Sequence, residues 1–299
     1  SGSDQSCHRC GGWCWLTFSA EAVLHWDPLV FFASAARIRS CEMSGVHMFL
    51  LALCAVHMLP TFVAGVTHVV VPCYNEETRL PQQKFLDFTA DLENSEIRFT
   101  FVNDGSKDGT LKILNELAAQ RPDQIAVFDM PQNGGKAEAV RNGMLHVLSK
   151  YNLETSDYVA FWDGDLATPL ETLAPFISRL HSTPSLEMVF GARIALLGRE
   201  IEREPGRHYL GRVFATLAST VLDLRIYDTQ CGAKMFRATH DLWSVLSVPF
   251  TSGWIFDVEL IARFKRMRAG SSKLPCEAII YEYPLESWRD IAGSKLDFM

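Results

Sequence analysis

Two aspartates separated by one glycine follow an apolar run in this chain of 299 residues. The stretch YVAFWDGDLATPL (158–170) places Asp163 and Asp165 directly after a run that contains Phe161 and Trp162. Two carboxylates two positions apart repel each other unless a positive group lies between them. Mg²⁺ and Mn²⁺ prefer carboxylate oxygens and also bridge phosphates. The pair therefore predicts a divalent-metal site.

Two further polar stretches follow apolar runs in the same way. Cys73-Tyr74-Asn75-Glu76 follows one such run, and Asn103-Asp104-Gly105-Ser106 follows the next. The apolar runs predict strands, and the periodic segments between them predict helices. The expected strands are 67–74, 97–104, 125–130, 158–165 and 186–193, and the expected helices include 110–120 and 136–151. This alternation predicts an α/β fold with a mainly parallel sheet, in which ligands bind at the carboxyl ends of the strands.

The sequence lacks the two commonest phosphate-binding loops. No G-x-G-x-x-G follows any expected strand, and G-x-x-x-x-G-K-[ST] is absent. The stretch NGGK (133–136) has neither the spacing nor the Ser or Thr of a P-loop. Hydride transfer to a nicotinamide and P-loop phosphoryl transfer therefore lose support. A diphosphate held by a metal remains, and a metal assists such a group as it leaves.

From about residue 67 onward the chain resembles the family 2 glycosyltransferases, and among them the enzymes that act on polyprenyl phosphates. The stretches that carry this resemblance are VVVPCYNEETRL, FVNDGSKDGT, NGGKAEAVRNGM, WDGDLATP, GAR, YDTQCGAKMF, GWIFDVELI and GSKL. The resemblance implies the GT-A fold, a Rossmann-like and mostly parallel sheet flanked by helices. It further implies inverting transfer of glucose from UDP-glucose to dolichyl phosphate, giving dolichyl β-D-glucosyl phosphate for protein N-glycosylation.

The same resemblance implies roles for individual residues. Those expected to bind the nucleotide sugar are Pro72, Tyr74, Glu76, Asp104, Lys136, Asp163, Gly164 and Arg193. Asp163, Asp165 and Gln230 are expected to hold Mg²⁺ or Mn²⁺, and Arg207 or Arg212 the acceptor phosphate. Asp163, Asp165 and Asp228 form the expected catalytic set. Asp228 would orient the acceptor or the sugar, or would instead be a structural partner of Arg225. Ala167 stands where related mannosyl-phosphate-forming enzymes have a metal-binding glutamine.

Three alternative functions remain open at this point. One is a bacterial-type polyprenyl-phosphate transferase that uses another nucleotide sugar, and another is a dolichyl-phosphate mannosyltransferase that uses GDP-mannose. The third, from a different class, is an inactive nucleotide-sugar-binding protein, against which the intact aspartate pair and Lys136 argue. The identity of the donor sugar depends on loop conformations that the sequence does not specify.

Composition limits the partners and the compartment. A hydrophobic content of 48% with 21% charged residues is typical of a globular protein, and a net charge of −7 argues against nucleic acid as the main partner. Five of the eight cysteines, Cys7, Cys10, Cys14, Cys41 and Cys54, lie in the first 60 residues. This pattern favours free thiols over a disulfide framework. CHRCGGWC is half a zinc site with no matching second pair.

The N-terminal region is expected to differ from the catalytic domain at 67–299. Residues 1–45 show no clear periodicity, whereas 46–66 hold no formal charge over about the length of a membrane span. The second segment is interpreted as a membrane anchor, with a signal peptide and a buried helix as alternatives.

Membrane attachment also follows from the implied substrates, because a polyprenyl acceptor stays in the bilayer while UDP-sugars are made in the cytosol. We therefore expect an endoplasmic reticulum membrane enzyme with a cytosolic catalytic domain, although Arg37 and Arg39 favour the opposite orientation. The segment 206–224 mixes arginines with apolar residues, as an interfacial helix would, or as a helix packed on the sheet would.

Overall fold

The computed structural model describes residues 65–203 and 205–291. The irregular segment predicted for 1–45 lies outside the described residues, and so does the span predicted for 46–66, except for its last two residues. Within the described ranges, no helix combines the length and the apolar character needed to cross a membrane.

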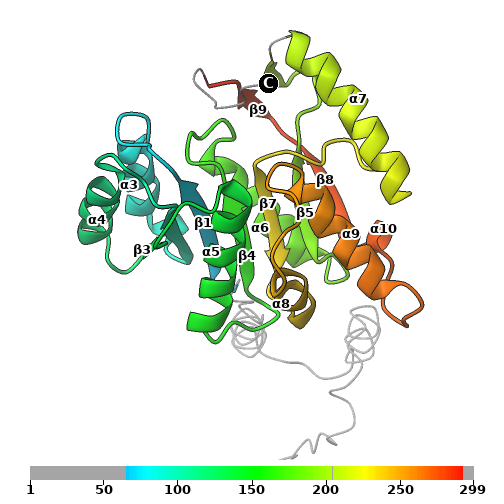
Figure 1. Ribbon diagram of the computed structural model, residues 1–299, viewed down its shortest axis with the longest axis horizontal. Helices are drawn as coiled ribbons and strands as arrows, with labels where there is room; N and C mark the ends of the chain where they lie inside the picture. Colours follow the sequence, from blue (N-terminus) through cyan, green and yellow to red (C-terminus); the bar gives the residue numbers. More distant parts are fainter. Residues whose placement is uncertain (1–64, 204, 292–299) are drawn as a thin grey trace, which may run out of the picture. The chain divides into compact units, whose positions relative to one another are not determined.

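One sheet of seven strands organises the described part of the chain (Figure 1). The strands are β1 (Thr67–Cys73), β2 (Ile97–Asn103), β3 (Ile125–Asp129), β4 (Tyr158–Trp162), β5 (Met188–Ala192), β7 (Ala233–Arg237) and β8 (Ile280–Pro284). Their order is β3-β2-β1-β4-β7-β5-β8. Only β7 among them pairs antiparallel, with β4 and with β5. The other neighbours pair in parallel, which confirms the mainly parallel sheet.

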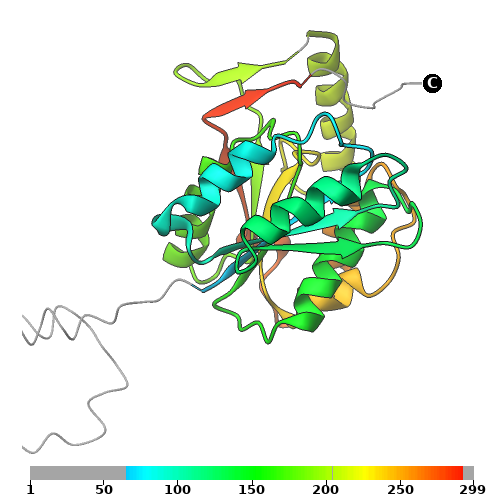
Figure 2. The same ribbon diagram turned by 90° about the vertical axis from the view of Figure 1, so that its left-hand side faces the viewer.

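Helices cover both faces of the sheet, as Figure 2 shows from the side. One face packs against α3 (Gln82–Ala90), α4 (Thr110–Gln120) and α6 (Leu173–Ser182), and the other against α5 (Lys136–Lys150), α8 (His240–Leu246) and α9 (Phe256–Arg268). Successive residues of a strand point to opposite faces of the sheet. Val69 therefore packs on the face covered by α3, α4 and α6, and Val70 packs on the face covered by α5, α8 and α9. A sheet covered on both faces needs strands that are apolar throughout, which explains the continuous apolar runs.

All five strands expected from the sequence are present, and α4 and α5 match the two expected helices. The sequence did not indicate β7 and β8. The β7 sequence AKMFR carries Lys234 at its second position, and this lysine is completely buried. A buried charge interrupts the apolar pattern by which internal strands are recognised.

One helix and a second, two-stranded sheet lie beyond the carboxyl ends of the parallel strands. The helix α7 (Pro205–Leu222) contacts α9, and β6 (Glu200–Glu202) pairs in parallel with β9 (Ser287–Arg289). Figure 1 shows α7 and β9 at the same end of the domain. The amide of Arg289 donates to the carbonyl of Ala167 at 3.2 Å, which ties β9 to the loop after the aspartate pair. The remaining short helices are η2 (Leu92–Asn94), η3 (Leu170–Thr172) and α10 (Cys276–Ile279).

Candidate active site

The polar ends of β1, β2 and β4 meet at one edge of the sheet. These strands are neighbours in the order β2-β1-β4 and run in parallel. The amide of Asn75 after β1 donates to Oγ of Ser106 after β2 at 3.1 Å, and the amide of Glu76 donates to Oγ1 of Thr110 at 2.7 Å. The chain runs outward from β1 to β2 and β3 and then returns to β4 on the other side of β1, and ligands of such sheets bind at this reversal of the strand order. The expected meeting of the strand ends is confirmed.

Asp163 is fixed from three sides. Its amide donates to the carbonyl of Gly232 at 2.9 Å, and Nζ of Lys136 lies 2.5 Å from its Oδ1 as an ion pair without the alignment of a hydrogen bond. A Cβ atom on Gly232 would lie 1.9 Å from Oδ2 of Asp163, so only glycine leaves room for this carboxylate. The turn closes at Leu166, whose φ of 55° is uncommon for a residue with a side chain.

Asp165 is less neutralised than Asp163. Its Oδ1 accepts a hydrogen bond from the amide of Ala167 at 3.0 Å. Burial and the negative charge of Asp163 raise the pKa of Asp165 above its usual value. Partial burial alone would lower the pKa of Lys136, but the charge of Asp163 outweighs it and raises this pKa. The pair thus holds more negative charge than Lys136 compensates.

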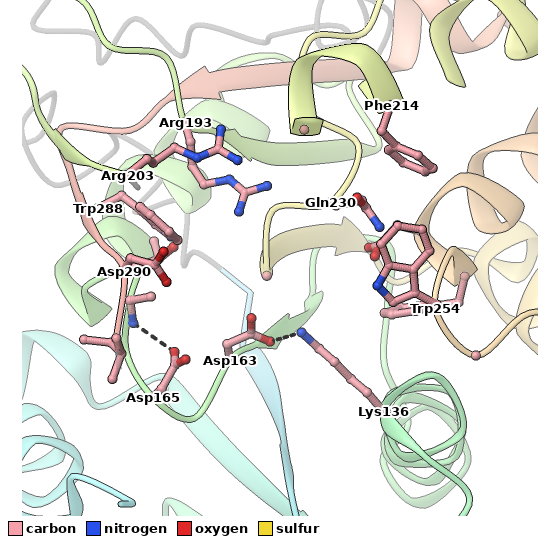
Figure 3. Close-up of a pocket in the computed structure, with 18 of the residues that line it drawn as sticks. Lys136, Asp163, Asp165, Arg193, Arg203, Phe214, Gln230, Trp254, Trp288 and Asp290 are labelled. Carbon is pink, nitrogen blue, oxygen red and sulfur yellow. Dashed lines mark hydrogen bonds and ion pairs between the residues drawn. The ribbon is translucent and has the colours of Figure 1, made fainter. Parts of the chain in front are cut away.

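The donor set of this turn fits Mg²⁺ or Mn²⁺. Both carboxylates supply the hard oxygen ligands that these ions prefer. Within the described residues, no group of three or more His, Cys, Asp or Glu side chains could hold a metal. Two carboxylates are enough where diphosphate oxygens and water complete the coordination. Gln230 lines the same cavity, and Figure 3 shows it beside Trp254, across the cavity from Asp165. Its role as a metal ligand stays a prediction.

Lys136 is placed by the loop that precedes it. The carboxylate of Asp104, which is only 2% exposed, accepts hydrogen bonds from Nδ2 of Asn133 at 3.0 Å and from the amides of Gly134 and Gly135 at 2.7 and 2.9 Å. Burial raises the pKa of Asp104, although the two amides oppose this. Gly135 has a φ of 81°, and α5 begins at the next residue. Asp104 therefore holds the loop, and its role in binding the nucleotide sugar stays a prediction.

Arg193 and Asp228 form a buried bidentate pair. Nε of Arg193 lies 2.6 Å from Oδ2 of Asp228, and Nη2 lies 2.7 Å from Oδ1. Burial favours the neutral acid, but the charge and hydrogen bonds of Arg193 prevail and hold the pKa of Asp228 down at about 2. The partner of Asp228 is thus Arg193 and not Arg225. Arg193 lines the cavity, so Asp228 acts as a positioning residue behind it.

Of the two arginines expected at the acceptor phosphate, only Arg212 has a described side chain. Arg212 stacks on Tyr227, with 3.6 Å from its guanidinium carbon to the ring centre, donates to the carbonyl of Tyr227 at 2.9 Å, and does not line the cavity. The side chain of Arg207 lies outside the described ones. Arg203 lines the cavity instead. Arg203 belongs to the charged run REIEREPGR, a pattern that usually indicates a solvated face, and nothing in the local pattern separates Arg203 from its neighbours.

One cavity of about 770 Å³ joins these groups. Figure 3 shows Lys136 and the aspartate pair along one side, the two arginines with Trp288 and Asp290 along a second, and Phe214, Gln230 and Trp254 along a third. The sequence did not single out Phe214, Trp254, Asp257, Trp288 or Asp290 as site residues. Only the stretch GWIFDVELI pointed to the segment that carries two of them.

The remaining predicted residues do not line the cavity. They are Pro72, Tyr74, Glu76 and Gly164. Glu76 forms an ion pair with Arg79, and a Cβ on Gly164 would lie 3.2 Å from Cγ1 of Val71. Their predicted contacts with the nucleotide are not tested by this geometry.

The sequence of this chain is similar to those of known proteins. Residues 68–242 match the family described as "Glycosyl transferase family 2". The chain is 32% identical to a dolichyl-phosphate beta-glucosyltransferase from Saccharomyces cerevisiae and 32% identical to one from Homo sapiens, in each case over 76% of this chain and 68% of the relative.

The fold also agrees with a solved structure. Glucosyl-3-phosphoglycerate synthase from Mycobacterium tuberculosis, in complex with Mn²⁺ and UDP-glucose, superimposes with a TM-score of 0.51 and 20% identity, over 76% of this chain and 72% of the other. Identity at this level establishes the fold alone. The GT-A fold expected from the sequence is confirmed.

Proposed function

Since the chain belongs to glycosyltransferase family 2, we propose that it transfers glucose from UDP-glucose to dolichyl phosphate, forming dolichyl β-D-glucosyl phosphate with inversion. One observation carries this proposal: a single cavity has a charged wall at the ends of the strands and an apolar wall on α7. Val213, Phe214 and Leu217 supply the apolar wall. A nucleotide sugar suits the first wall, and a lipid that ends in a phosphate suits the junction of the two.

The donor side of the cavity is Lys136 with the aspartate pair. Asp163 and Asp165 would hold Mg²⁺ or Mn²⁺, and the bound ion would neutralise the diphosphate of the leaving UDP. Lys136 adds a positive charge beside Asp163, fixed by the loop that Asp104 organises. The family relationship supports UDP-glucose as the donor, because the relatives are named as beta-glucosyltransferases.

The acceptor side of the cavity is the pair Arg193 and Arg203. Both guanidinium groups lie over Trp288, with 5.2 and 5.9 Å between the guanidinium carbons and the ring centre. Burial and the nearby charge of Arg193 lower the pKa of Arg203, so an anion between the two would relieve their repulsion. A lipid phosphate is already ionised at neutral pH and needs no general base, which agrees with the engagement of Asp228 by Arg193.

A membrane location completes the proposal. The exposed side of α7 carries Tyr209, Val213, Leu217 and Val221 at intervals of four residues. These four residues form the α7 stripe. An apolar stripe on an exposed helix favours binding in the plane of a membrane interface. The catalytic domain would face the cytosol at the endoplasmic reticulum, where UDP-glucose and the lipid meet.

The first experiment measures transfer by the full chain to dolichyl phosphate in detergent. The donors are UDP-glucose, UDP-galactose, UDP-N-acetylglucosamine and GDP-mannose, each with Mg²⁺ or Mn²⁺. We expect turnover with UDP-glucose and a β-linked product. Turnover with GDP-mannose in preference to UDP-glucose would overturn the donor assignment, and binding without turnover of any donor would leave a nucleotide-sugar-binding protein.

The metal assignment is tested by Asp165→Asn. Loss of this carboxylate should remove several kcal/mol of transition-state stabilisation and weaken Mn²⁺ binding in the presence of UDP, measured by electron paramagnetic resonance. The matched control is Asp223→Asn, because Asp223 is an exposed carboxylate outside the cavity that also pairs with a lysine, Lys265, at 3.3 Å. Mn²⁺ binding and activity equal to those of the control would contradict the assignment.

A further inference from the structure

Asp257 is a carboxylate on the cavity wall to which the proposed transfer assigns no role. Asp257 lies in the first turn of α9, is 6% exposed and lines the cavity together with Trp254. Its Oδ1 lies 2.5 Å from Nζ of Lys234, which also donates to the carbonyl of Cys231 at 2.7 Å. Lys234 is completely buried, between the rings of Phe161 and Phe190. The lysine therefore fixes one oxygen of Asp257 in place.

The second oxygen of this carboxylate, Oδ2, can still accept a hydrogen bond. In the described ranges, no hydrogen-bond donor other than Lys234 contacts Asp257. Oδ2 is not among the buried polar atoms that lack a partner, so it is accessible at the cavity wall. An ionised carboxylate accepts hydrogen bonds and donates none, so any hydrogen-bond partner of Oδ2 must be a donor.

The charge of Asp257 restricts what that partner can be. A phosphate would be repelled by the carboxylate, and Lys136 is already paired with Asp163. A hydroxyl group remains, and the transferred sugar is the part of the substrates that carries several hydroxyls. Lys136 and Asp163 line the same cavity as Asp257, so this carboxylate shares the cavity with the proposed diphosphate subsite.

The neighbouring Trp254 suits the same ligand. Its ring is held by an edge-to-face contact with Phe214, 5.4 Å between centres, yet the residue remains 50% exposed. In ligand pockets lined by apolar and aromatic side chains, a small number of polar groups fixes the orientation of the ligand. An aromatic ring and an accessible carboxylate on one wall offer an apolar surface to the C–H face of a sugar and an acceptor to its hydroxyls.

We propose that Asp257 accepts a hydrogen bond from a hydroxyl of the transferred sugar while Trp254 packs against that sugar, and that these two residues select the donor. The inference rests on the proposed function, since it assigns the sugar subsite of the same cavity. Lys234 is a positioning residue in this arrangement, because it orients Asp257 without facing the cavity.

The test compares the transferred sugar with its deoxy analogues. The donors are the nucleotide sugar that the wild type uses best in the donor panel and its 2-, 3-, 4- and 6-deoxy forms. We expect at least one deoxy form to have a kcat/KM about 10- to 100-fold lower in the wild type, the cost of losing a hydrogen bond to a charged group. In Asp257→Ala this discrimination should disappear, while the affinity for UDP alone stays unchanged.

Asp257→Ala leaves the charge of Lys234 buried without its partner, which can prevent folding. A second variant therefore separates the loss of the hydrogen bond from the loss of the fold. Asp257→Leu combined with Lys234→Met removes both charges and should also abolish the discrimination. The control is Asp223→Asn, which should retain the wild-type ratios. The inference is overturned if a folded variant discriminates among the deoxy donors as the wild type does. A wild type that prefers a sugar other than glucose would refute the donor assignment and leave this comparison intact.

Discussion

The position of Asp163 depends on the absence of a Cβ atom at Gly232, which packs against it. Gly232 brings its backbone against the carboxylate, and the same carboxylate meets Lys136 on its other side. Catalysis by a bound ion requires that its ligands be held to within a fraction of an ångström. The glycine in DTQCG therefore serves the aspartate pair from a distant part of the sequence.

Gly232→Ala should lower activity by displacing Asp163. The new Cβ would lie 1.9 Å from Oδ2, so the carboxylate must leave the position in which it pairs with Lys136. A misplacement of about 1 Å can cost about 10²-fold in rate, and we expect a loss of this order in kcat/KM with saturating Mn²⁺. The control is Gly206→Ala in α7, where the Cβ meets nothing within 4 Å. Equal activities of the two variants would contradict the role assigned to Gly232.

At the scale of elements, the loop between β3 and α5 sets the direction of Lys136. The carboxylate of Asp104, which directly follows β2, accepts hydrogen bonds from the amides of Gly134 and Gly135. The start of α5 is thus tied to a neighbouring strand end rather than to a side-chain cap of its own. This explains why NGGK is present without forming a P-loop: its glycine amides bind a carboxylate of the protein.

Asp104→Asn should release this loop. An asparagine presents one acceptor oxygen and one donor group, so at least one of the two amides would face a donor. We expect a loss of about tenfold or more in kcat/KM for UDP-glucose, because at least one hydrogen bond from an amide to a charged carboxylate is lost, at about 1.5–3 kcal/mol each. Asp129→Asn is the control, because Asp129 ends β3 and contacts Asn103 outside the loop.

A double-mutant cycle separates positioning from general destabilisation. If Asp104 acts by placing Lys136, then Asp104→Asn should add little to the effect of Lys136→Ala on kcat/KM. Fully additive losses would mean that the two residues act independently. Melting temperatures of the same variants report the structural part of the effect.

The sequence was sufficient to predict one wall of the cavity, because the strand ends and the aspartate pair are local patterns. The other walls could not be predicted in the same way. Phe214, Trp254 and Trp288 lie on α7, on the loop before α9 and on β9, and only the packing of these elements brings them together. Arg203 was missed for a related reason: an arginine in a charged run has no local signal that it faces a cavity.

At the scale of the whole described domain, charge and apolar surface are distributed unevenly. The net charge of the chain is −7, yet the cavity collects Lys136, Arg193 and Arg203. The α7 stripe begins beside this cavity, since two of its members, Val213 and Leu217, also line the cavity. A lipid phosphate could therefore reach the arginines while its chain stays in contact with apolar side chains.

A charge placed on the α7 stripe should impair transfer to a membrane-borne acceptor. Val221 is 83% exposed and does not line the cavity, so Val221→Asp should leave folding intact. The substitution removes the burial of one valine side chain in the membrane interface, worth about 1.5 kcal/mol or more. We expect about a tenfold lower rate with dolichyl phosphate in vesicles. The rate with a short, water-soluble polyprenyl phosphate should not change.

Val248→Asp provides the matched control for this experiment. Val248 is 60% exposed and follows α8, away from the α7 stripe, so the same substitution adds the same charge to a different surface. If α7 lies on the membrane, only Val221→Asp should lose vesicle activity and co-sedimentation with vesicles. Equal behaviour of the two variants on vesicles, or an equal loss on both acceptors for Val221→Asp, would show that α7 is an ordinary surface helix. The lipid chain would then have to leave the cavity by another route.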